Sequence, residues 1–561
     1  MIARTRPLAS GRTPSEQEQQ ALRSHRSCSA LILPCAIIVL ILAMFGPLMG
    51  GGVVLHLDSP VNLIGPYPRA AIAVGPVPPE LAARAPVDAL LVALYRALPW
   101  GQVRLLPVIA AVVLAAWGFA RLFAGRRLAI FGATLLYATN PFMYERIVAG
   151  QDLLVLGYSL LPLLLSALWA APTTRRILTL AVVSAAAAAL SLHLVFVAGV
   201  LCGTFLVTDV VRRRWLEART LVIGGGLAAA CSLYWIVPAV AHWGRLGVVP
   251  VTDLSLFRST PDPHLGLAAN LAGLYGFWRQ GWPLPKDGLP GWPVLLVALW
   301  AVMAAGLANA LRDERRRERL LPVLVAGLIG LVLAAGNKGP AGGAYAWMFE
   351  HVPLVRIMRE PQKWLVLLVL AYAVAFGEGV DAIQRAVRGR NARVAAALVV
   401  LAIPAAYGFS SFWGSGGYVR PSAYPASWAQ ADAVMGEGPG LVVALPWHRY
   451  LALPWAQDRV VSDPMASAFR RGVIVSADPE FTGLARSGRD PLADGIGELL
   501  DEGAAGRQVA GDLRRLGVQY LLLAKVDDWI NSMWILDQDA IVVARSWDDL
   551  VLFEIQPPPE P

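Results

Sequence analysis

Long apolar runs alternate with short arginine-rich connections over the larger, N-terminal part of this chain. Eleven runs approach the ~20 residues that an α-helix needs to cross a bilayer: they are 30–50, 103–123, 128–140, 153–171, 177–191, 192–211, 220–243, 292–311, 320–336, 363–381 and 394–412. The pattern predicts a polytopic α-helical membrane protein with about 11 transmembrane helices. The run 128–140 is short, and 177–211 is also compatible with a hairpin or a bent pair.

The arginines of the connections predict the orientation of the chain. They cluster at 126–127, 175–176, 212–214, 312–319 and 385–393, and further arginines lie in the N-terminal tail, 1–29. The positive-inside rule assigns these segments to the cytoplasm. An odd number of spans then puts the C-terminus outside. We therefore expect a multi-pass protein of the cell membrane with a cytoplasmic N-terminus and an extracytoplasmic C-terminal domain.

A change of pattern near residue 413 divides the chain into two parts. Residues 30–413 form the predicted transmembrane domain, whose outer loops are 51–102, 244–291 and 337–362. Residues 414–417, Gly-Ser-Gly-Gly, are expected to act as a hinge. Beyond them, 414–561 is predicted to be a soluble α/β domain that contributes to acceptor binding or partner contact. Its expected strands are 441–445, 520–524, 541–544 and 550–555, and 496–516 has helical spacing.

Composition agrees with a membrane protein. The apolar fraction of 56% and the mean hydropathy of +0.54 exceed what a soluble core requires. A net charge of +9 would suggest nucleic-acid binding in a soluble chain. Here, however, the arginines lie where anionic lipids of the inner leaflet would be, so membrane lipids are the expected partners and nucleic acid is not. The four cysteines lie in or beside spans, which indicates neither a disulfide framework nor a thiolate metal site.

Ionisable residues are scarce within the spans, and this scarcity bears on the functional class. Charged side chains at mid-bilayer usually mark transport pathways or proton relays. Only His193 could lie deep, and a lone histidine among alanine, leucine and serine is more often structural. Polar side chains crowd the outer loops instead, which favours chemistry at the outer face. A flippase or transporter of lipid-linked sugars, and an inactive scaffold subunit of an envelope-assembly complex, stay as alternatives.

The first outer loop carries a candidate general base. It begins with His56 and Asp58 directly after the first span and continues through Tyr67 to an amphipathic stretch, 86–98, that suits the membrane interface. Asp58 could take a proton from a hydroxyl group, or it could cap a turn that follows it. The loop has no DxD pair, so a divalent metal ion is possible but not indicated.

The outer loops also carry cations and aromatic side chains. Arg356, Arg359 and Lys363 are three and four residues apart, which on one helix would place them on one face. Guanidinium groups match phosphate oxygens, although snorkelling to lipid headgroups or ion pairing with nearby carboxylates would also explain the cluster. Trp278 lies in an aromatic-rich outer loop with Trp282. An interfacial aromatic belt or carbohydrate stacking would account for these rings.

Several of these segments together resemble a known family. They are the first-loop aspartate, Asn-Pro-Phe-Met-Tyr-Glu-Arg-Ile-Val-Ala-Gly-Gln at 140–151 with Gly-Tyr at 157–158 and Leu-Pro at 161–162, and Arg-Glu-Pro-Gln-Lys-Trp at 359–364. The combination resembles the GT-C superfamily of membrane glycosyltransferases, nearest the actinobacterial α-(1→3)-arabinofuranosyltransferase group. The likeness extends to 424–428 and 445–447 in the outer domain. This chain is much shorter than that group and lacks its long carbohydrate-binding extensions.

The resemblance implies a function and a set of site residues. It implies transfer of a sugar, arabinofuranose or a hexose, from a polyprenyl-phosphate donor to a cell-envelope glycan or glycolipid, with inversion at the anomeric carbon. No cofactor is assigned besides this donor substrate. Asp58 would be the base. Fixed cations would stabilise the charge that grows on the leaving phosphate. The implied donor-phosphate residue is Arg359, with Lys363 or Arg356 beside it, and Glu145 and Arg146 are second-rank candidates for the site. The residues His56, Tyr67 and Trp278 of the outer loops are also predicted to bind substrate.

Overall fold

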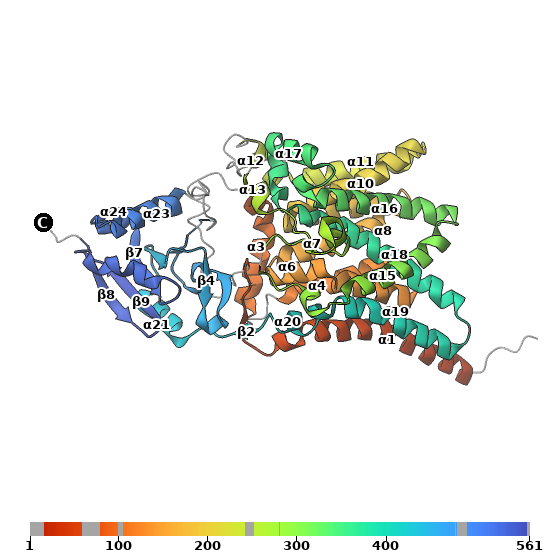
Figure 1. Cartoon of the computed structure of the whole chain (residues 1–561), viewed down its shortest axis with the longest axis horizontal. Helices are drawn as coiled ribbons and strands as arrows, with labels where there is room; N and C mark the ends of the chain where they lie inside the picture. The colour runs from red at the N-terminus through yellow and green to blue at the C-terminus, as the bar shows by residue number, and fades with distance from the viewer. Residues whose placement is uncertain are drawn as a thin grey trace, which may run out of the picture.

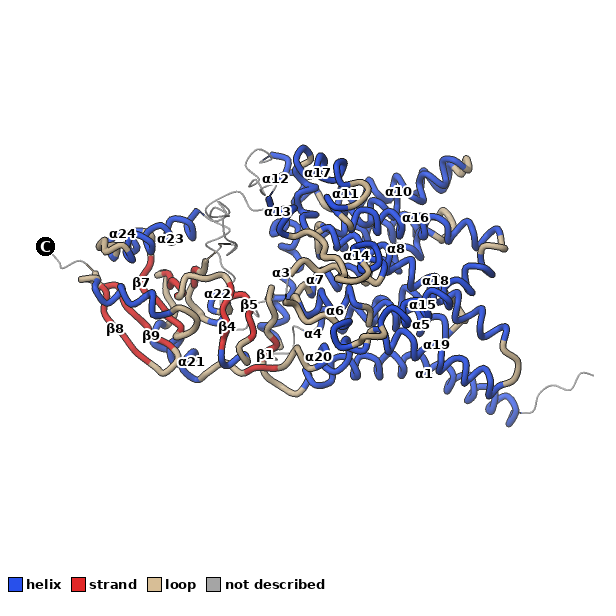
Figure 2. The backbone as a smooth tube through the Cα atoms, viewed as in Figure 1, coloured by secondary structure: helices blue, strands red, loops and turns tan. Residues whose placement is uncertain are grey.

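The computed structural model describes residues 16–58, 79–98, 105–241, 252–279, 281–476, 478 and 491–557. Figure 1 shows a bundle of helices with a smaller α/β domain at one end, formed by the C-terminal part of the chain. Figure 2 shows that the described strands belong to this domain or to its junction with the bundle. The predicted fold class, a helical membrane part with a C-terminal soluble α/β domain, is confirmed.

The apolar runs of the sequence are helical in the bundle. Its longer helices are α1 Glu16–Phe45, α3 Pro79–Ala97, α4 Leu105–Leu122, α5 Arg127–Ala138, α9 Thr174–Leu190, α10 His193–Val211, α11 Trp215–Cys231, α15 Trp292–Ala310, α16 Glu314–Ala334, α17 Gly342–His351, α18 Leu365–Ala386 and α19 Arg390–Tyr407. Shorter helices between them are α6 Pro141–Val148, α7 Asp152–Tyr158, α8 Leu161–Leu168, α12 Leu233–Ala241, α13 Thr252–Leu256 and α14 Gly266–Ala272.

Several expected spans differ from single straight helices. The run 153–171 is broken between α7 and α8, and α12 is bent by 70° from α11. The stretch 177–211 forms two separate helices, α9 and α10. Within the described residues, six helices have the length and apolarity to cross a membrane, or seven if the bent pair is one span. The number of eleven spans therefore stays a prediction.

Helix α18 lies at the centre of the bundle. Fifteen of its residues are buried, and α5, α15 and α16 pack around it. Close approach to α15 requires glycine, because a Cβ atom on Gly379 would lie 2.1 Å from the carbonyl oxygen of Val302. On the outer helices, large apolar side chains such as Leu31, Val294 and Leu398 are exposed. In a membrane protein these side chains face lipid.

The arginine-rich connections gather at the end of the bundle opposite the soluble domain (Figure 1). Ion pairs join them there: Arg126 with Glu378 and Asp381 at 2.9 and 3.0 Å, Arg316 with Glu378 at 3.5 Å, and Glu318 with Arg212 and Arg214. Segments that the sequence assigned to one side of the membrane are thus neighbours in space.

The segment expected to be a hinge is a packed turn. Residues 413–415 have left-handed backbone angles within α20, Phe412–Gly416, and Gly414 and Ser415 are buried. A Cβ atom on Gly414 would meet the carbonyl oxygen of Val419 at 2.7 Å and Leu48 at 3.3 Å. The expectation of a flexible linker is therefore wrong, because the glycines serve tight packing against the end of the first span.

The soluble domain is built on a five-stranded sheet with strand order β6-β3-β7-β9-β8. The strands are β3 Leu441–Leu445, β6 Val473–Ile474, β7 Val518–Ala524, β8 Ile541–Ser546 and β9 Leu550–Ile555, with a separate hairpin of β4 Tyr450–Leu453 and β5 Arg459–Ser462. Strands β6, β3 and β7 are parallel, whereas β9 runs antiparallel to β7 and β8. The four predicted strands are confirmed, and β6 and the hairpin were missed.

The prediction of one continuous helix at 496–516 is wrong. Two helices occupy this region, α23 Pro491–Ala504 and α24 Ala510–Arg515, and the chain turns between them at Gly506, whose φ is +92°. Such a φ is favourable only for glycine, so the helix ends there. Shorter helices, α21 Ala426–Met435 and α22 Met465–Ala468, complete the domain.

The first outer loop joins the two parts of the molecule. Its strand β1, Val53–Val54, pairs antiparallel with β2, Pro421–Ser422. Farther along, the amide of Ser462 donates to the carbonyl of Leu57 at 2.7 Å. The amide of Asp58 donates to the carbonyl of Ala149 in the bundle at 3.1 Å. The loop is therefore held between the hairpin of the soluble domain and the short helices of the bundle.

Candidate functional site

Asp58 lies at the junction of the two parts, and its side chain is exposed. Besides the backbone bond to Ala149, its Oδ1 accepts a hydrogen bond of 2.9 Å from the hydroxyl of Tyr450, the first residue of β4. The carboxylate is thus oriented by the soluble domain while its backbone is fixed by the bundle. Residues 59–78, which include Tyr67 and the turn that Asp58 could cap, lie outside the described residues.

The chemistry of Tyr450 suits a hydrogen-bond donor. Burial raises the pKa of its phenol, and the negative charge of Asp58 raises it further. Positive charge from Arg449 and Arg359 opposes this shift without reversing it. The phenol therefore keeps its proton and donates to Asp58 throughout the physiological pH range. The influence of Arg359 on Tyr450 also indicates that this cation lies on the same side of the junction.

A network of buried charges lies in the bundle beside this junction. Arg146 on α6 is fully buried, and its guanidinium pairs with Glu360 at 3.0 Å. The other oxygen of Glu360 pairs with Lys363 at 2.8 Å. Arg146 also donates to Gln151 at 3.0 Å and lies over the ring of Phe277, 4.6 Å from its centroid. One carboxylate therefore links two cations from segments far apart in the sequence.

The network continues to His193 and to Glu145. The ammonium of Lys363 donates to Nε2 of His193 at 3.0 Å. Because an ammonium group can only donate, Nε2 accepts, and Nδ1 donates to the Ser191 hydroxyl at 3.0 Å. Glu145 is fully buried, with its carboxylate 3.9 Å from Arg146. His193, which is partly buried, therefore extends this polar chain to the start of α10.

The expectation that Arg356, Arg359 and Lys363 share one helix face is wrong. The segment forms two short 3-10 helices, Pro353–Arg359 and Pro361–Trp364, which are separated at Glu360. The proline ring of Pro361 disfavours helical geometry at the residue before it, so a continuous helix is interrupted there. Three cations at helical spacing consequently have three different environments.

The three cations differ in their contacts and in their burial. Arg356 donates to two carbonyls at the end of α17, those of Phe349 at 3.1 Å and Glu350 at 2.8 Å. Lys363 is buried and bound to Glu360. Arg359 is partly exposed, and its guanidinium lies over the ring of Phe257 at 4.5 Å. Of the three cations, Arg359 is the one whose charge acts on Tyr450 at the junction, so it is the candidate for contact with phosphate.

Trp278 belongs to the same surroundings as Arg359. Its indole meets the ring of Phe257 edge to face, with centroids 4.6 Å apart, and Arg359 covers that ring as well. The next residue towards the N-terminus, Phe277, lies under Arg146. The aromatic segment therefore separates the partly exposed Arg359 from the buried network and gives both cations an aromatic face.

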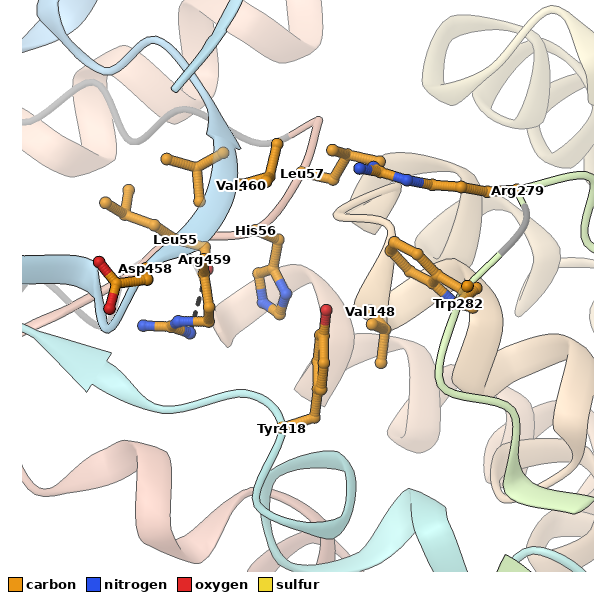
Figure 3. A pocket seen from close by; sticks show the side chains of 12 residues that line it. Leu55, His56, Leu57, Val148, Arg279, Trp282, Tyr418, Asp458, Arg459 and Val460 are labelled. Carbon is orange, nitrogen blue, oxygen red and sulfur yellow. Dashed lines mark hydrogen bonds between the residues drawn. The ribbon is translucent and has the colours of Figure 1, made fainter. Parts of the chain in front are cut away.

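A cavity of about 360 Å³ opens at the junction (Figure 3). Its walls come from the first outer loop, α6, the aromatic loop before α15, the turn after α20 and the β4–β5 hairpin. The lining residues are Leu55, His56, Leu57, Val148, Arg279, Gly281, Trp282, Tyr418, Asp458, Arg459, Val460 and Val461. His56 is buried in this wall, two residues from Asp58. Sequence reasoning missed the contribution of Tyr418 and of the hairpin, which have no local signal.

No group of three or more His, Cys, Asp or Glu side chains is arranged to hold a metal ion among the residues that the structure describes. The candidate site therefore consists of one exposed carboxylate with its tyrosine donor, one partly exposed guanidinium, a buried ion network and an adjacent cavity. Such a set can remove a proton from a hydroxyl group beside a bound anion.

Comparison with known proteins identifies the fold. No family model and no curated protein sequence matches the chain. Among solved structures, it is similar to the arabinofuranosyltransferase AftD from Mycobacteria, with 18% identity and a TM-score of 0.54 over 94% of this chain and 41% of that chain. The chain thus spans about two fifths of the length of that protein. The chain therefore shares its fold with a solved arabinofuranosyltransferase structure over most of its own length.

Two other solved structures match more distantly. The oligosaccharyltransferase of Archaeoglobus fulgidus in its apo form gives 12% identity and a TM-score of 0.45, over 88% of this chain and 70% of that chain. ArnT from Cupriavidus metallidurans bound to undecaprenyl phosphate gives 12% identity and a TM-score of 0.46, over 95% of this chain and 99% of that chain.

Proposed function

We propose that this chain, a membrane protein with a GT-C fold, is a glycosyltransferase. It transfers a sugar from a polyprenyl-phosphate donor to a hydroxyl group of a cell-envelope glycan or glycolipid at the outer face. The fold shared with an arabinofuranosyltransferase supports this function. The observation that carries it is the Asp58 carboxylate, exposed at the junction and held there by Tyr450.

Asp58 is the proposed general base. An exposed carboxylate that keeps one oxygen on a tyrosine hydroxyl has its second oxygen available to accept a proton from a sugar hydroxyl. Its position between bundle and soluble domain allows a lipid-linked donor to approach from the membrane side. A glycan acceptor would approach from the soluble side.

Arg359 is the proposed ligand of the donor phosphate. It is partly exposed near Tyr450, whereas Lys363 and Arg146 are buried and share the charge of Glu360. Lys363 and Arg146 would act on the phosphate through the electric field of their charges rather than by contact. Fixed cations stabilise the charge that develops on a leaving phosphate more than they stabilise the ground state, which lowers the barrier.

The reaction follows from these roles. Asp58 removes the proton of the acceptor hydroxyl while its oxygen attacks the anomeric carbon on the face opposite the phosphate. The new carbon–oxygen bond forms as the bond to the phosphate oxygen breaks, and the polyprenyl phosphate leaves with the electron pair. One displacement inverts the anomeric carbon. Arabinofuranose and a hexose are both candidates for the transferred sugar.

The test is sugar transfer by the purified chain in nanodiscs, with labelled polyprenyl-phosphate sugars and an envelope-glycolipid acceptor. We expect one donor to be consumed. Asp58→Asn removes the base and should lower the transfer rate by about 100-fold or more. Tyr450→Phe keeps the ring but removes a hydrogen bond to a charged group, which should cost about ten-fold.

Asp539→Asn is the matched control, because Asp539 is an exposed aspartate in the turn before β8. It should transfer at the wild-type rate. Full activity in Asp58→Asn with normal folding would remove the proposed base. If lipid-linked sugar binds but no donor is consumed, a flippase or an inactive scaffold subunit becomes the better explanation.

A further inference from the structure

A second cavity lies in the bundle, where α9, α10 and α11 contact one another. Figure 1 shows α10 and α11 together at one edge of the bundle. The cavity has a volume of about 210 Å³ and opens at the surface, where Val222 is 59% exposed. In a membrane protein this opening faces lipid. We call it the α9–α11 groove, and its lining residues are Leu180, Ser184, Gly199, Cys202, Gly203, Leu206, Leu221, Val222 and Gly225.

Three glycines keep the groove open. A Cβ atom on Gly199, Gly203 or Gly225 would meet no atom within 4 Å, so packing inside the protein does not require glycine there. Gly224 differs, because its Cβ atom would lie 2.9 Å from Leu180. Glycine destabilises a helix relative to alanine, so three glycines without an internal packing role indicate a surface shaped for something outside the chain. The glycines alone do not identify the occupant.

The groove ends at ionisable side chains from all three helices. Residues three or four apart lie on one face of a helix, so a residue at that spacing from a lining residue continues the same wall. Helices α9 and α11 begin at the arginine-rich end of the bundle, and α10 ends there. The ionisable residues at this end are Arg176 before Leu180 on α9, Glu217 before Leu221 on α11, and Asp209 after Leu206 on α10.

Arg176 is buried without a partner. It is 3% exposed, and its guanidinium makes no ion pair or hydrogen bond within the described part of the chain. Its charge acts on Asp209, Glu217 and Cys202, and Cys202 lines the groove. The Nε atom is enclosed, but the two terminal nitrogens are not fully enclosed. A buried charge without a partner is costly, so an anionic group at the end of the groove would stabilise Arg176.

Asp209 is the opposite charge at this end. It is 7% exposed, and its carboxylate has no hydrogen bond or ion pair with any residue that the structure describes. The neighbouring Arg214 is engaged with Glu318 instead. Arg176 and Asp209 thus lie close enough to interact electrostatically but do not pair directly. A ligand with one negative and one positive group would satisfy both.

We propose that the α9–α11 groove binds a glycerophospholipid whose headgroup carries a phosphate and a primary ammonium. The phosphate contacts Arg176, the ammonium contacts Asp209, and one acyl chain lies along the glycine-lined wall. Guanidinium groups match phosphate oxygens, and an ammonium with N–H groups can donate to a carboxylate. A transmembrane helix is about 10–12 Å wide and would not fit a groove of this volume.

The lipid site is separate from the candidate functional site. It belongs to the leaflet at the arginine-rich end of the bundle, whereas Asp58 lies at the junction with the soluble domain. The proposal therefore does not depend on glycosyl transfer.

Native mass spectrometry of the purified full chain tests the proposal. The chain is titrated with phosphatidylethanolamine, phosphatidylcholine and phosphatidylglycerol that have identical acyl chains. We expect phosphatidylethanolamine to bind most tightly. Phosphatidylcholine has no N–H to donate and phosphatidylglycerol has no cation, so each should bind about ten-fold more weakly. Glycerophosphoethanolamine, which has no acyl chains, should not compete, and this arm distinguishes a lipid from a free phosphate compound.

Gly225→Leu tests the position of the acyl chain. The added side chain fills the groove, which should weaken phosphatidylethanolamine binding by about ten-fold or more. Gly226→Leu is the matched control, because a Cβ atom on Gly226 also meets nothing within 4 Å but Gly226 does not line the groove. This variant should bind the lipid as the wild type does.

Two charge variants test the headgroup. Asp209→Asn should remove the preference for phosphatidylethanolamine over phosphatidylcholine and leave phosphatidylcholine binding unchanged. Arg176→Gln should weaken the binding of all three lipids, and if this variant does not fold, Asp209→Asn decides the headgroup assignment. Equal lipid binding by Gly225→Leu and Gly226→Leu, equal affinity of the wild type for the three lipids, or displacement of phosphatidylethanolamine by polyprenyl phosphate would overturn the inference.

Discussion

Individual residues set the chemistry at the junction of the two domains. Asp58 could be identified from the sequence, because a carboxylate directly outside the first span suits a base at the outer membrane surface. Tyr450 could not, because it lies 392 residues away and belongs to a strand that the sequence pattern did not reveal. A hydrogen-bond partner so distant along the chain follows only from the docking of the soluble domain.

A second carboxylate near the junction is held in an unfavourable environment. Asp463, directly after β5, is 2% exposed. Its Oδ1 accepts a hydrogen bond from the amide of Met465, but its Oδ2 has no partner among the described residues. Burial therefore raises the pKa of Asp463 to about 7, and the amide bond opposes this shift only in part.

The raised pKa of Asp463 predicts a pH dependence of stability. Because the folded-state value of about 7 exceeds the usual value for aspartate of about 3.9, folding favours the protonated form. The contribution of Asp463 to the free energy of unfolding is then fully present below about pH 4. It is lost as the pH rises to about 7, by about 1.4 kcal/mol per pH unit. Asp463→Asn keeps an oxygen for Met465 and should remove this loss. Thermal unfolding midpoints at pH 5 and pH 8 measure it.

Asp539→Asn serves as the control, since this exposed aspartate lies in the same domain. Its midpoints should follow those of the wild type at both pH values. If Asp463→Asn lost as much stability between pH 5 and pH 8 as the wild type, the buried carboxylate would not be the cause.

At the scale of elements, very short strands decide where the first outer loop lies. Strands β1 and β2 have only two residues each, which is too short for any periodic pattern. Their pairing nevertheless brings Asp58 to the hairpin of the soluble domain. The prediction that three cations share one helix face is wrong for a related reason. Pro361 divides the segment into two short helices, and the cations on them contact different partners.

Gly52 makes the pairing of β1 with β2 possible. Its φ is +79°, and a Cβ atom would lie 2.6 Å from the carbonyl oxygen of Ser422. Gly52→Ala should therefore separate the loop from β2, at a cost of about 1–3 kcal/mol in the free energy of unfolding, and should lower the transfer rate by misplacing Asp58. Unfolding and transfer assays measure the two effects.

Gly50→Ala is the matched control two residues earlier. Gly50 has a φ of −78°, and a Cβ atom there would meet nothing within 4 Å. This variant should retain wild-type stability and activity. Equal behaviour of both alanine variants would mean that the β1–β2 pairing does not position the base.

At the scale of the whole molecule, the arginine-rich connections and the soluble domain lie at opposite ends of the bundle (Figure 1). Ion pairs between separate connections, such as Arg126 with Glu378, bind that end together. The positive-inside rule predicts that this end faces the cytoplasm and that the soluble domain lies outside. In that orientation the candidate site would have access to the outer leaflet.

Fusions to alkaline phosphatase test this orientation. The enzyme needs disulfides that form outside the cytoplasm, so it is active only after export. A fusion after Gln556 should be active, and a fusion at Arg388 in the connection between α18 and α19 should be inactive. The reverse pattern would place the candidate site in the cytoplasm and contradict the use of an outer-face acceptor.

The sequence by itself determined the features that depend on local pattern. Apolar runs of bilayer length gave the helices, and alternating apolar residues gave strands β3, β7, β8 and β9. The arginine clusters predicted an orientation, and the position of Asp58 after the first span made it a candidate. These features are encoded within windows of a few to twenty residues, where periodicity and composition are informative.

Only the tertiary structure decided how distant segments meet. It brought Tyr450 to Asp58, linked Arg146 to Lys363 through Glu360, and enclosed a cavity between the first loop and the β4–β5 hairpin. No local pattern predicts such contacts. The position of a side chain within its own segment depends on the local sequence, whereas its contact partner depends on how distant segments pack. The physical reason is that burial of charge and apolar surface is decided by the whole fold.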